Sequence, residues 1–207
     1  MRIAVPRGRP HVGGLVDELA PRVELAPFRL ADDSAEARWT TRVGLAWDAE
    51  ALQIRFDCRD EDAWSSHAAR DAPLWQEEAV EVFVAAGEED PREYFEFEVS
   101  PSGALFDALV VNPHGDRREW RVDPGWDCPG IRWRVGSGER GADWWARLAI
   151  PFRGLGLAGP PTALRANFFR IERPRGGEAE LSCWRPTLTS PADFHRPARF
   201  GLLDLIR

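Results

Sequence analysis

Apolar and polar residues alternate with a period of two from about Arg42 to the end of the chain, in short runs separated by Pro, Gly and Asp. Successive side chains of a β-strand point to opposite faces, so this alternation predicts strands with one buried face. Ten runs show the pattern: Thr41–Trp47, Leu52–Arg59, Glu78–Ala86, Tyr94–Val99, Ala104–Val111, Ile131–Val135, Trp144–Ile150, Leu164–Glu172, Glu180–Trp184 and Phe200–Ile206. Short strands at even spacing favour a sandwich or a barrel. We predict an all-β fold, an antiparallel β-sandwich with a jelly-roll or immunoglobulin-like two-sheet architecture.

Two of these runs predict which side chains are buried. Every second residue from Leu52 to Cys58 is apolar, so Cys58 is expected to be a small core residue rather than a reactive thiol. In the run that begins at Glu78, three valines share one face, and Glu81 and Phe83 share the other.

Helical structure is expected only in short turns, at His11–Leu19, at Ser65–Asp71 and just after Pro151. The sequence has no internal repeat, no low-complexity linker and no change of composition along its length. We therefore predict a single domain over residues 1–207.

The charge of the chain excludes several classes of function. The net charge is −7 and the pI is about 5.2, which argues against nucleic acid or an anionic membrane as a partner. All 27 basic residues are arginine, so mechanisms that need a lysine are excluded. Three cysteines without paired spacing fit a reducing compartment better than a disulfide framework. The N-terminal stretch lacks the apolar run of a signal peptide, so we expect a cytoplasmic protein.

Common catalytic and metal-binding motifs are missing from the sequence. It contains no H-E-x-x-H, no G-x-S-x-G and no phosphate loop, and its four histidines are scattered. The acidic run of Asp57, Asp60, Glu61 and Asp62 is compatible with a structural calcium ion or with a solvated strand end. No cofactor is predicted beyond that calcium alternative.

Glutamates and tryptophans leave two functional readings open. Glu96 and Glu98 lie about 7 Å apart along one strand face, a spacing compatible with the carboxyl pair of a glycosidase or with a polar outer face. The chain also has 10 Trp and 11 Phe but one Tyr. An indole stacks on the apolar face of a sugar ring, and carboxylates accept its hydroxyls, so this composition is typical of a sugar site as well as of a core.

Four blocks of sequence, taken in order, resemble the family 9 carbohydrate-binding modules and their stand-alone relatives of the DOMON-like sandwich class. The blocks are TRVGLAWDAEALQIRFDCRDED, PLWQEEAVEVFV, EYFEFEVSPSGALFD and SCWRPTLTSPADFHRPARFGLLDLI, and they cover about residues 39–206. The resemblance implies a β-sandwich that binds sugar without catalysis, by clamping a ring between two aromatic side chains.

The resemblance also implies the residues of the site. Trp75 matches one stacking tryptophan, Glu81 matches a carboxylate that takes sugar hydroxyls, and Phe194 stands where the family has its second stacking tryptophan. Glu98 falls at a family arginine that bonds the sugar, which reverses the charge there, and His195 follows Phe194 toward the same slot. Phe194 is expected to be an exposed loop aromatic.

The expected partner is therefore a small saccharide or the end of a polysaccharide chain, and neither the saccharide nor the oligomeric state is indicated. Two other functions stay open. One is a glycoside-processing enzyme that uses a glutamate pair, and the other is a structural or interaction sandwich with a vestigial site.

Overall fold

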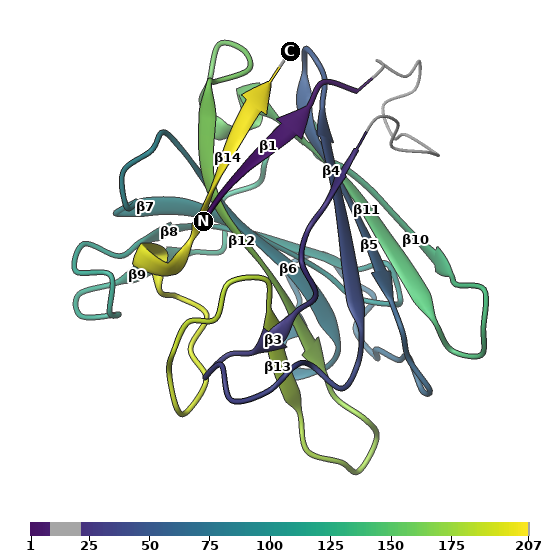
Figure 1. The fold of residues 1–207 in the computed structure, drawn as a ribbon. Helices are drawn as coiled ribbons and strands as arrows, with labels where there is room; N and C mark the ends of the chain where they lie inside the picture. The colour runs from purple at the N-terminus through teal and green to yellow at the C-terminus, as the bar shows by residue number, and fades with distance from the viewer. Residues whose placement is uncertain (9–21, 207) are drawn as a thin grey trace.

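The computed structural model describes residues 1–8 and 22–206, which form two facing β-sheets (Figure 1). The larger sheet contains, in spatial order, β1 (Arg2–Pro6), β14 (Gly201–Ile206), β12 (Ala163–Glu172), β6 (Ala79–Ala86), β7 (Glu93–Val99), β8 (Leu105–Val111) and β9 (Arg121–Asp123), with β13 (Glu180–Cys183) on β12 and β3 (Arg29–Leu30) on β13. The smaller sheet contains β10 (Arg132–Ser137), β11 (Trp144–Pro151), β5 (Ala51–Cys58), β4 (Thr41–Trp47) and β2 (Val23–Glu24).

Nearly all of the strand pairing is antiparallel. The pair of β1 with β14 is parallel, with Arg2 opposite Leu202 and Pro6 opposite Ile206. The chain thus has the predicted antiparallel β-sandwich, and each of the ten predicted strands is present with ends shifted by no more than a few residues. The prediction missed β1, β2, β3 and β9, of which β2, β3 and β9 have two or three residues each.

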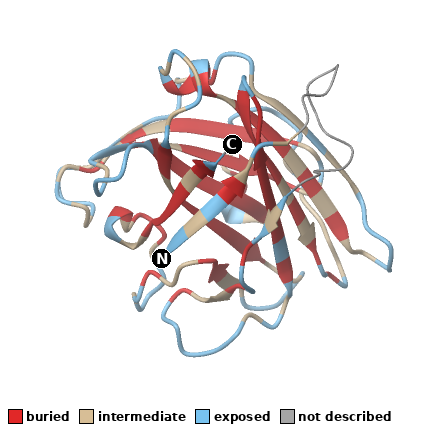
Figure 2. Cartoon of the chain, turned by 45° about the horizontal axis from the view of Figure 1, so that its top comes forward, coloured by how far each residue is buried: buried red, intermediate tan, exposed pale blue. Residues whose placement is uncertain are grey.

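The main apolar core lies between the two sheets. Alternate residues of β5, from Leu52 to Cys58, face alternate residues of β6 and β12 such as Val82 and Phe168. Cys58 is 3% exposed, and burial raises the pKa of its thiol to about 12, which confirms the expected core role. Figure 2 shows buried residues along the strands of both sheets and exposed residues mainly in the connections.

A second apolar core covers part of the outer face of the larger sheet. Phe83 of β6 is its centre, with Phe169 at 4.8 Å and Tyr94 at 5.6 Å between ring centroids. The chain from Trp184 to Phe200 covers these rings and adds Phe194 and Phe200 to the cluster. An outer face that is covered in this way can hold buried polar groups, and the candidate site lies here.

Residues 1–8 and 22–206 also contain three single-turn 3₁₀ helices: η1 (Leu74–Gln76), η2 (Phe152–Leu155) and η3 (Pro197–Arg199). The turn expected after Pro151 is confirmed as η2. The turn expected at Ser65–Asp71 is wrong, because Ser65 and the backbone N–H of Ser66 donate hydrogen bonds to Glu77 and hold this segment in a non-helical path. The turn expected at His11–Leu19 lies outside the described residues.

Candidate functional site

Two carboxylates lie between two phenyl rings on the outer face of the larger sheet. Residues directly opposite each other in paired strands point to the same face. The register therefore places four residues side by side in one row across the sheet. They are Phe169 of β12, Glu81 of β6, Glu98 of β7 and Phe106 of β8. Glu96 lies two residues before Glu98 on β7 and points to the same face.

Each end of this row carries one of the predicted aromatic residues. The Trp75 indole, from η1, packs edge-on against Phe106 with centroids 5.2 Å apart, and Trp75 is 45% exposed. The Phe194 ring stacks on Phe169 with centroids 4.4 Å apart and an interplanar angle of 22°. Phe194 is 6% exposed, so the expectation of an exposed ring is wrong. Phe169 and the other residues of the second core pack against the ring and cover it.

The three glutamates form a compact, buried cluster. Carboxylate oxygens of Glu81, Glu96 and Glu98 lie within 4.8 Å of one another, and each residue is at most 6% exposed. Burial raises the pKa of Glu96 to about 7. Burial and the negative charge of neighbouring glutamates raise the pKa of Glu81 and of Glu98 well above the usual range. The sequence placed Glu81 and Glu98 in the sugar-site hypothesis and Glu96 with Glu98 in the glycosidase alternative, and the structure brings all three together.

His195 lies in the second core rather than on an open surface. Its Nδ1 is 2.8 Å from the Tyr94 hydroxyl, and its ring packs against Phe83 and Trp120. Burial, followed by the charge of Arg117, lowers the pKa of His195 to about 3, so its imidazole is neutral at pH 7. A ligand contact by His195 stays a prediction, and the contacts that the structure gives it are structural.

A cavity of about 510 Å³ lies beside the segment that carries Phe194. It is lined by residues 188–193 together with Arg117 and Arg196, and does not include Trp75 or the three glutamates. Asp193 pairs there with the Arg117 guanidinium at 2.6 Å and with Arg196 Nε at 3.1 Å. Sequence reasoning missed Arg117 and Asp193, since Arg117 comes from a loop about 75 residues before Asp193 and no motif joins them.

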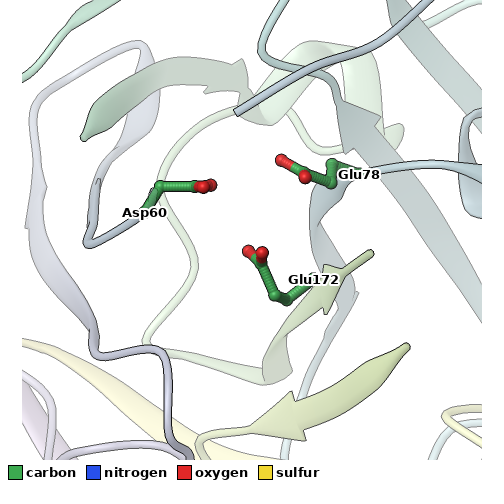
Figure 3. Close-up of side chains that lie close together, drawn as sticks. All are labelled: Asp60, Glu78 and Glu172. Carbon is green, nitrogen blue, oxygen red and sulfur yellow. The ribbon is translucent and has the colours of Figure 1, made fainter. Parts of the chain in front are cut away.

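A second carboxylate cluster lies at one end of the sandwich, where Asp60, Glu78 and Glu172 converge (Figure 3). The Arg170 guanidinium donates to Asp60 Oδ2 at 2.8 Å and also to Glu172. Burial raises the pKa of Glu78 to about 9, and Oε1 of Glu78 has no hydrogen-bond partner in the described parts of the chain. Oxygen donors of this kind suit a hard cation such as Ca²⁺.

The acidic run that suggested calcium contributes one residue to this cluster. Asp60 turns inward, whereas Asp57 pairs with Arg55, Asp62 pairs with Arg175, and Glu61 is exposed. The remaining oxygen donors come from Glu78, directly before β6, and from Glu172 at the end of β12, which the spacing of the run did not indicate.

The protonation of Glu78 predicts a pH dependence of stability. Its folded pKa, about 9, lies above the unfolded value near 4.5, so folding takes up a proton between these pH values. The free energy of unfolding should therefore fall as the pH rises from about 7 to 9. Glu78→Gln keeps the neutral form at every pH and should make this fall shallower, while the raised pKa values of the buried Glu81 and Glu98 maintain part of it. Urea unfolding, followed by circular dichroism at several pH values, measures the slope.

Two features sharpen this test. The lowered pKa of His195 makes the free energy of unfolding rise with pH, but only between about pH 3 and 6.5, which is below the pH 7 to 9 range of this test. Glu88→Gln is a matched control, because the side chain of Glu88 is 56% exposed. Equal slopes in the parent and in Glu78→Gln between pH 7 and 9 would contradict the assignment.

Comparison with known proteins gives one sequence match and several structural ones. No protein-family model matches the chain. A protein of Arthroderma benhamiae named "Extracellular protein" is 27% identical over 140 residues, which cover 63% of this chain and 62% of that protein. The chain thus spans less than two thirds of the length of the curated relative it matches. Among the described residues, none of the helices has the length and apolar character needed to cross a membrane.

Solved structures share the fold over nearly the whole chain. A candidate carbohydrate-binding protein from Bacteroides uniformis superposes with a TM-score of 0.77 at 14% identity, covering 99% of both chains. A family 9 carbohydrate-binding module from Caldicellulosiruptor kristjanssonii, in complex with cellotriose, gives 0.63 at 16% identity, with 99% of this chain and 93% of that chain covered. Its glucose complex gives 0.66 at 17% identity, with 100% and 96% covered. The chain therefore shares its β-sandwich fold with the family 9 carbohydrate-binding modules.

Proposed function

We propose that this protein binds a saccharide without catalysis, with one sugar ring stacked on the exposed indole of Trp75. The observation that carries the proposal is the exposed Trp75 indole at one end of a row of carboxylates. Few large apolar side chains among the described residues are as exposed as Trp75. A large exposed aromatic beside convergent polar groups is typical of a ligand site.

The chemistry of the row suits a sugar. An indole offers a flat apolar face to the C–H groups of a pyranose, and carboxylates accept hydrogen bonds from its hydroxyls. The Phe169–Phe194 pair lies at the other end of the row, about three strand spacings away, and is buried, so it offers no second open platform. Structures with the same fold bind glucose and cellotriose, which supports a saccharide or a chain end as the partner.

The placement of the glutamates argues against glycoside hydrolysis. A glycosidase needs two carboxyl groups that flank the scissile bond from opposite sides. Glu81, Glu96 and Glu98 lie on one face of two adjacent strands, with oxygens within 4.8 Å of one another. Because all three are buried and point to the same side of the sheet, this arrangement favours a binding role over a glycosidase.

Titration calorimetry against glucose, xylose, cellobiose and cellotriose tests the proposal. We expect dissociation constants in the micromolar to millimolar range, and a loss of about ten-fold or more in Trp75→Ala. Trp145→Ala is the matched control, because Trp145 lies on the outer face of the smaller sheet between Arg55 and Arg147. Unchanged affinity in Trp75→Ala contradicts the site, and aryl-glycoside turnover that is lost in Glu→Gln variants contradicts a purely binding role.

A further inference from the structure

The cavity beside the segment that carries Phe194 is open to solvent and has a volume of about 510 Å³. Sites for small molecules usually have volumes of about 300 to 1,000 Å³. Two of the lining residues can be reached from outside, since Leu188 is 54% exposed and the side chain of Arg117 is 42% exposed. The cavity therefore has room for a small solute and an opening through which the solute can enter.

Hydrogen bonds hold the two walls of the cavity together. The backbone N–H of Arg117 donates to Oδ1 of Asn112 at 3.2 Å, and Nδ2 of Asn112 donates to the carbonyl oxygen of His195 at 3.2 Å. Asn112 is fully buried, so it joins the loop of Arg117 to the segment that follows Asp193. The backbone N–H of Asp193 donates to Oγ1 of Thr189 at 2.8 Å. Walls that are ordered before binding lower the entropic cost of binding a ligand.

The charge of the lining is positive. Among the described residues that line the cavity, the two guanidiniums of Arg117 and Arg196 face the single carboxylate of Asp193, which leaves a net charge of +1 in a chain whose net charge is −7. Arg117 also acts through space on Glu81 and Glu96, but burial raises the pKa of both, to about 7 for Glu96. These two carboxyl groups are therefore largely protonated at pH 6, and the cavity favours an anion.

The arginines keep hydrogen-bond donors for such an anion. Asp193 lies 2.6 Å from Nη2 of Arg117 and 3.1 Å from Nε of Arg196. A guanidinium carries five N–H donors, so neither contact uses all the donors of its arginine. The guanidinium carbon of Arg117 lies 4.7 Å from the ring centroid of Trp120, a cation–π contact that helps to fix its position. A carboxylate can accept from such a planar group through both of its oxygens.

The lining combines these donors with an acceptor, since Asp193 can accept a hydrogen bond from a hydroxyl group. We infer that the cavity is a second binding site, which takes a sugar acid such as a hexuronic acid, with its carboxylate on Arg117 and Arg196 and a hydroxyl directed at Asp193. A phosphate ester fits less well, because it brings about two negative charges to a lining with a net charge of +1 that includes Asp193. Trp75 does not line this cavity, so the inference goes beyond the proposed function and does not depend on it.

Calorimetry on the full chain at pH 6 with a matched pair of ligands tests this inference. Methyl β-glucuronide and methyl β-glucoside differ only at C6, which is a carboxylate in the first and a hydroxymethyl group in the second. We expect the glucuronide to bind about ten-fold more tightly. In Arg117→Gln and in Arg196→Gln, the ratio of the two affinities should fall toward one. Arg118→Gln should keep the ratio, because Arg118 pairs with Asp116, its side chain is 72% exposed and it does not line the cavity.

The possible results separate this inference from the proposed function. Equal affinities for the two glycosides in the parent protein, or a preference for the glucuronide that persists in both arginine variants, overturn the inference alone. Trp75→Ala should still bind the glucuronide; if it does not, the acid is held at Trp75 and the inference is wrong. Arginine-dependent binding of the glucuronide without binding of any neutral sugar supports the inference and contradicts the proposed function.

Two further ligands test the chemical class. Sodium acetate supplies a carboxylate without a sugar, and glucose 6-phosphate supplies a phosphate ester on the same ring. We expect both to bind more weakly than the glucuronide. If either binds as tightly as the glucuronide and loses this binding in Arg117→Gln, the cavity is a general anion site and the assignment to a sugar acid is overturned.

Discussion

Replacing Arg170 by methionine should lower the free energy of unfolding by about 3 to 5 kcal/mol. Arg170 is fully buried, and its guanidinium donates to the carbonyl oxygen of Arg59, to Asp60 and to Glu172. Methionine fills much of the same volume but leaves the carboxylates of Asp60 and Glu172 without a cation beside Glu78. Removing one partner of a buried ionic network is costly because the other charges remain buried.

Urea unfolding monitored by circular dichroism measures this effect. Arg175→Met is the matched control, since the side chain of Arg175 is 63% exposed and pairs with Asp62 at the surface, where an ion pair contributes little. A loss of less than about 1 kcal/mol in Arg170→Met would show that the buried network does not hold this end of the sandwich. Addition of Glu172→Gln to Arg170→Met should recover part of the loss, because one uncompensated charge is removed.

Replacing Phe83 by alanine should destabilise the protein by about 3 to 5 kcal/mol, the usual cost of truncating a buried phenylalanine. Its ring is fully buried and contacts the rings of Phe169, Tyr94, His195 and Phe200. The truncation leaves a cavity between the sheet and the chain that covers it. Because the cavity disturbs the face of the sheet on which the candidate site lies, the sugar affinity should fall as well.

Phe83→Leu is the graded control for this prediction. Leucine fills most of the space, so its loss should be well below that of alanine. Chemical unfolding gives the stability, and calorimetry with the tightest saccharide gives the affinity. Equal stability of the parent and Phe83→Ala would mean that the second core does not contribute to the fold.

The sequence predicted the strands because their alternation is local. The alternation of apolar residues from Leu52 to Cys58 indicates which face of the strand is buried, and the structure confirms that prediction. The pairing of β1 with β14 was not predicted, since it joins residues at opposite ends of the chain and no local pattern marks it. The exposed indole of Trp75 agrees with what the resemblance implied.

The burial of the outer face of the larger sheet could not be predicted from the sequence. Phe83 alternates with valines, and its position alone indicates an outer, solvent-facing side of the sheet. The residues that bury it come from β12 and from the chain around Phe194, more than 80 residues later. For the same reason Glu81, Glu96 and Glu98 looked like a polar surface, whereas the covering chain makes them a buried cluster.

The parallel pairing of β1 with β14 affects how the protein is made. Arg2 leaves the ribosome roughly 200 residues before Leu202, its partner in the sheet. Until β14 has been synthesised, the nascent chain therefore lacks the strand that lies between β1 and β12, and the edges of those two strands stay unpaired. Chaperones that shield unpaired strand edges would act on this protein during that interval.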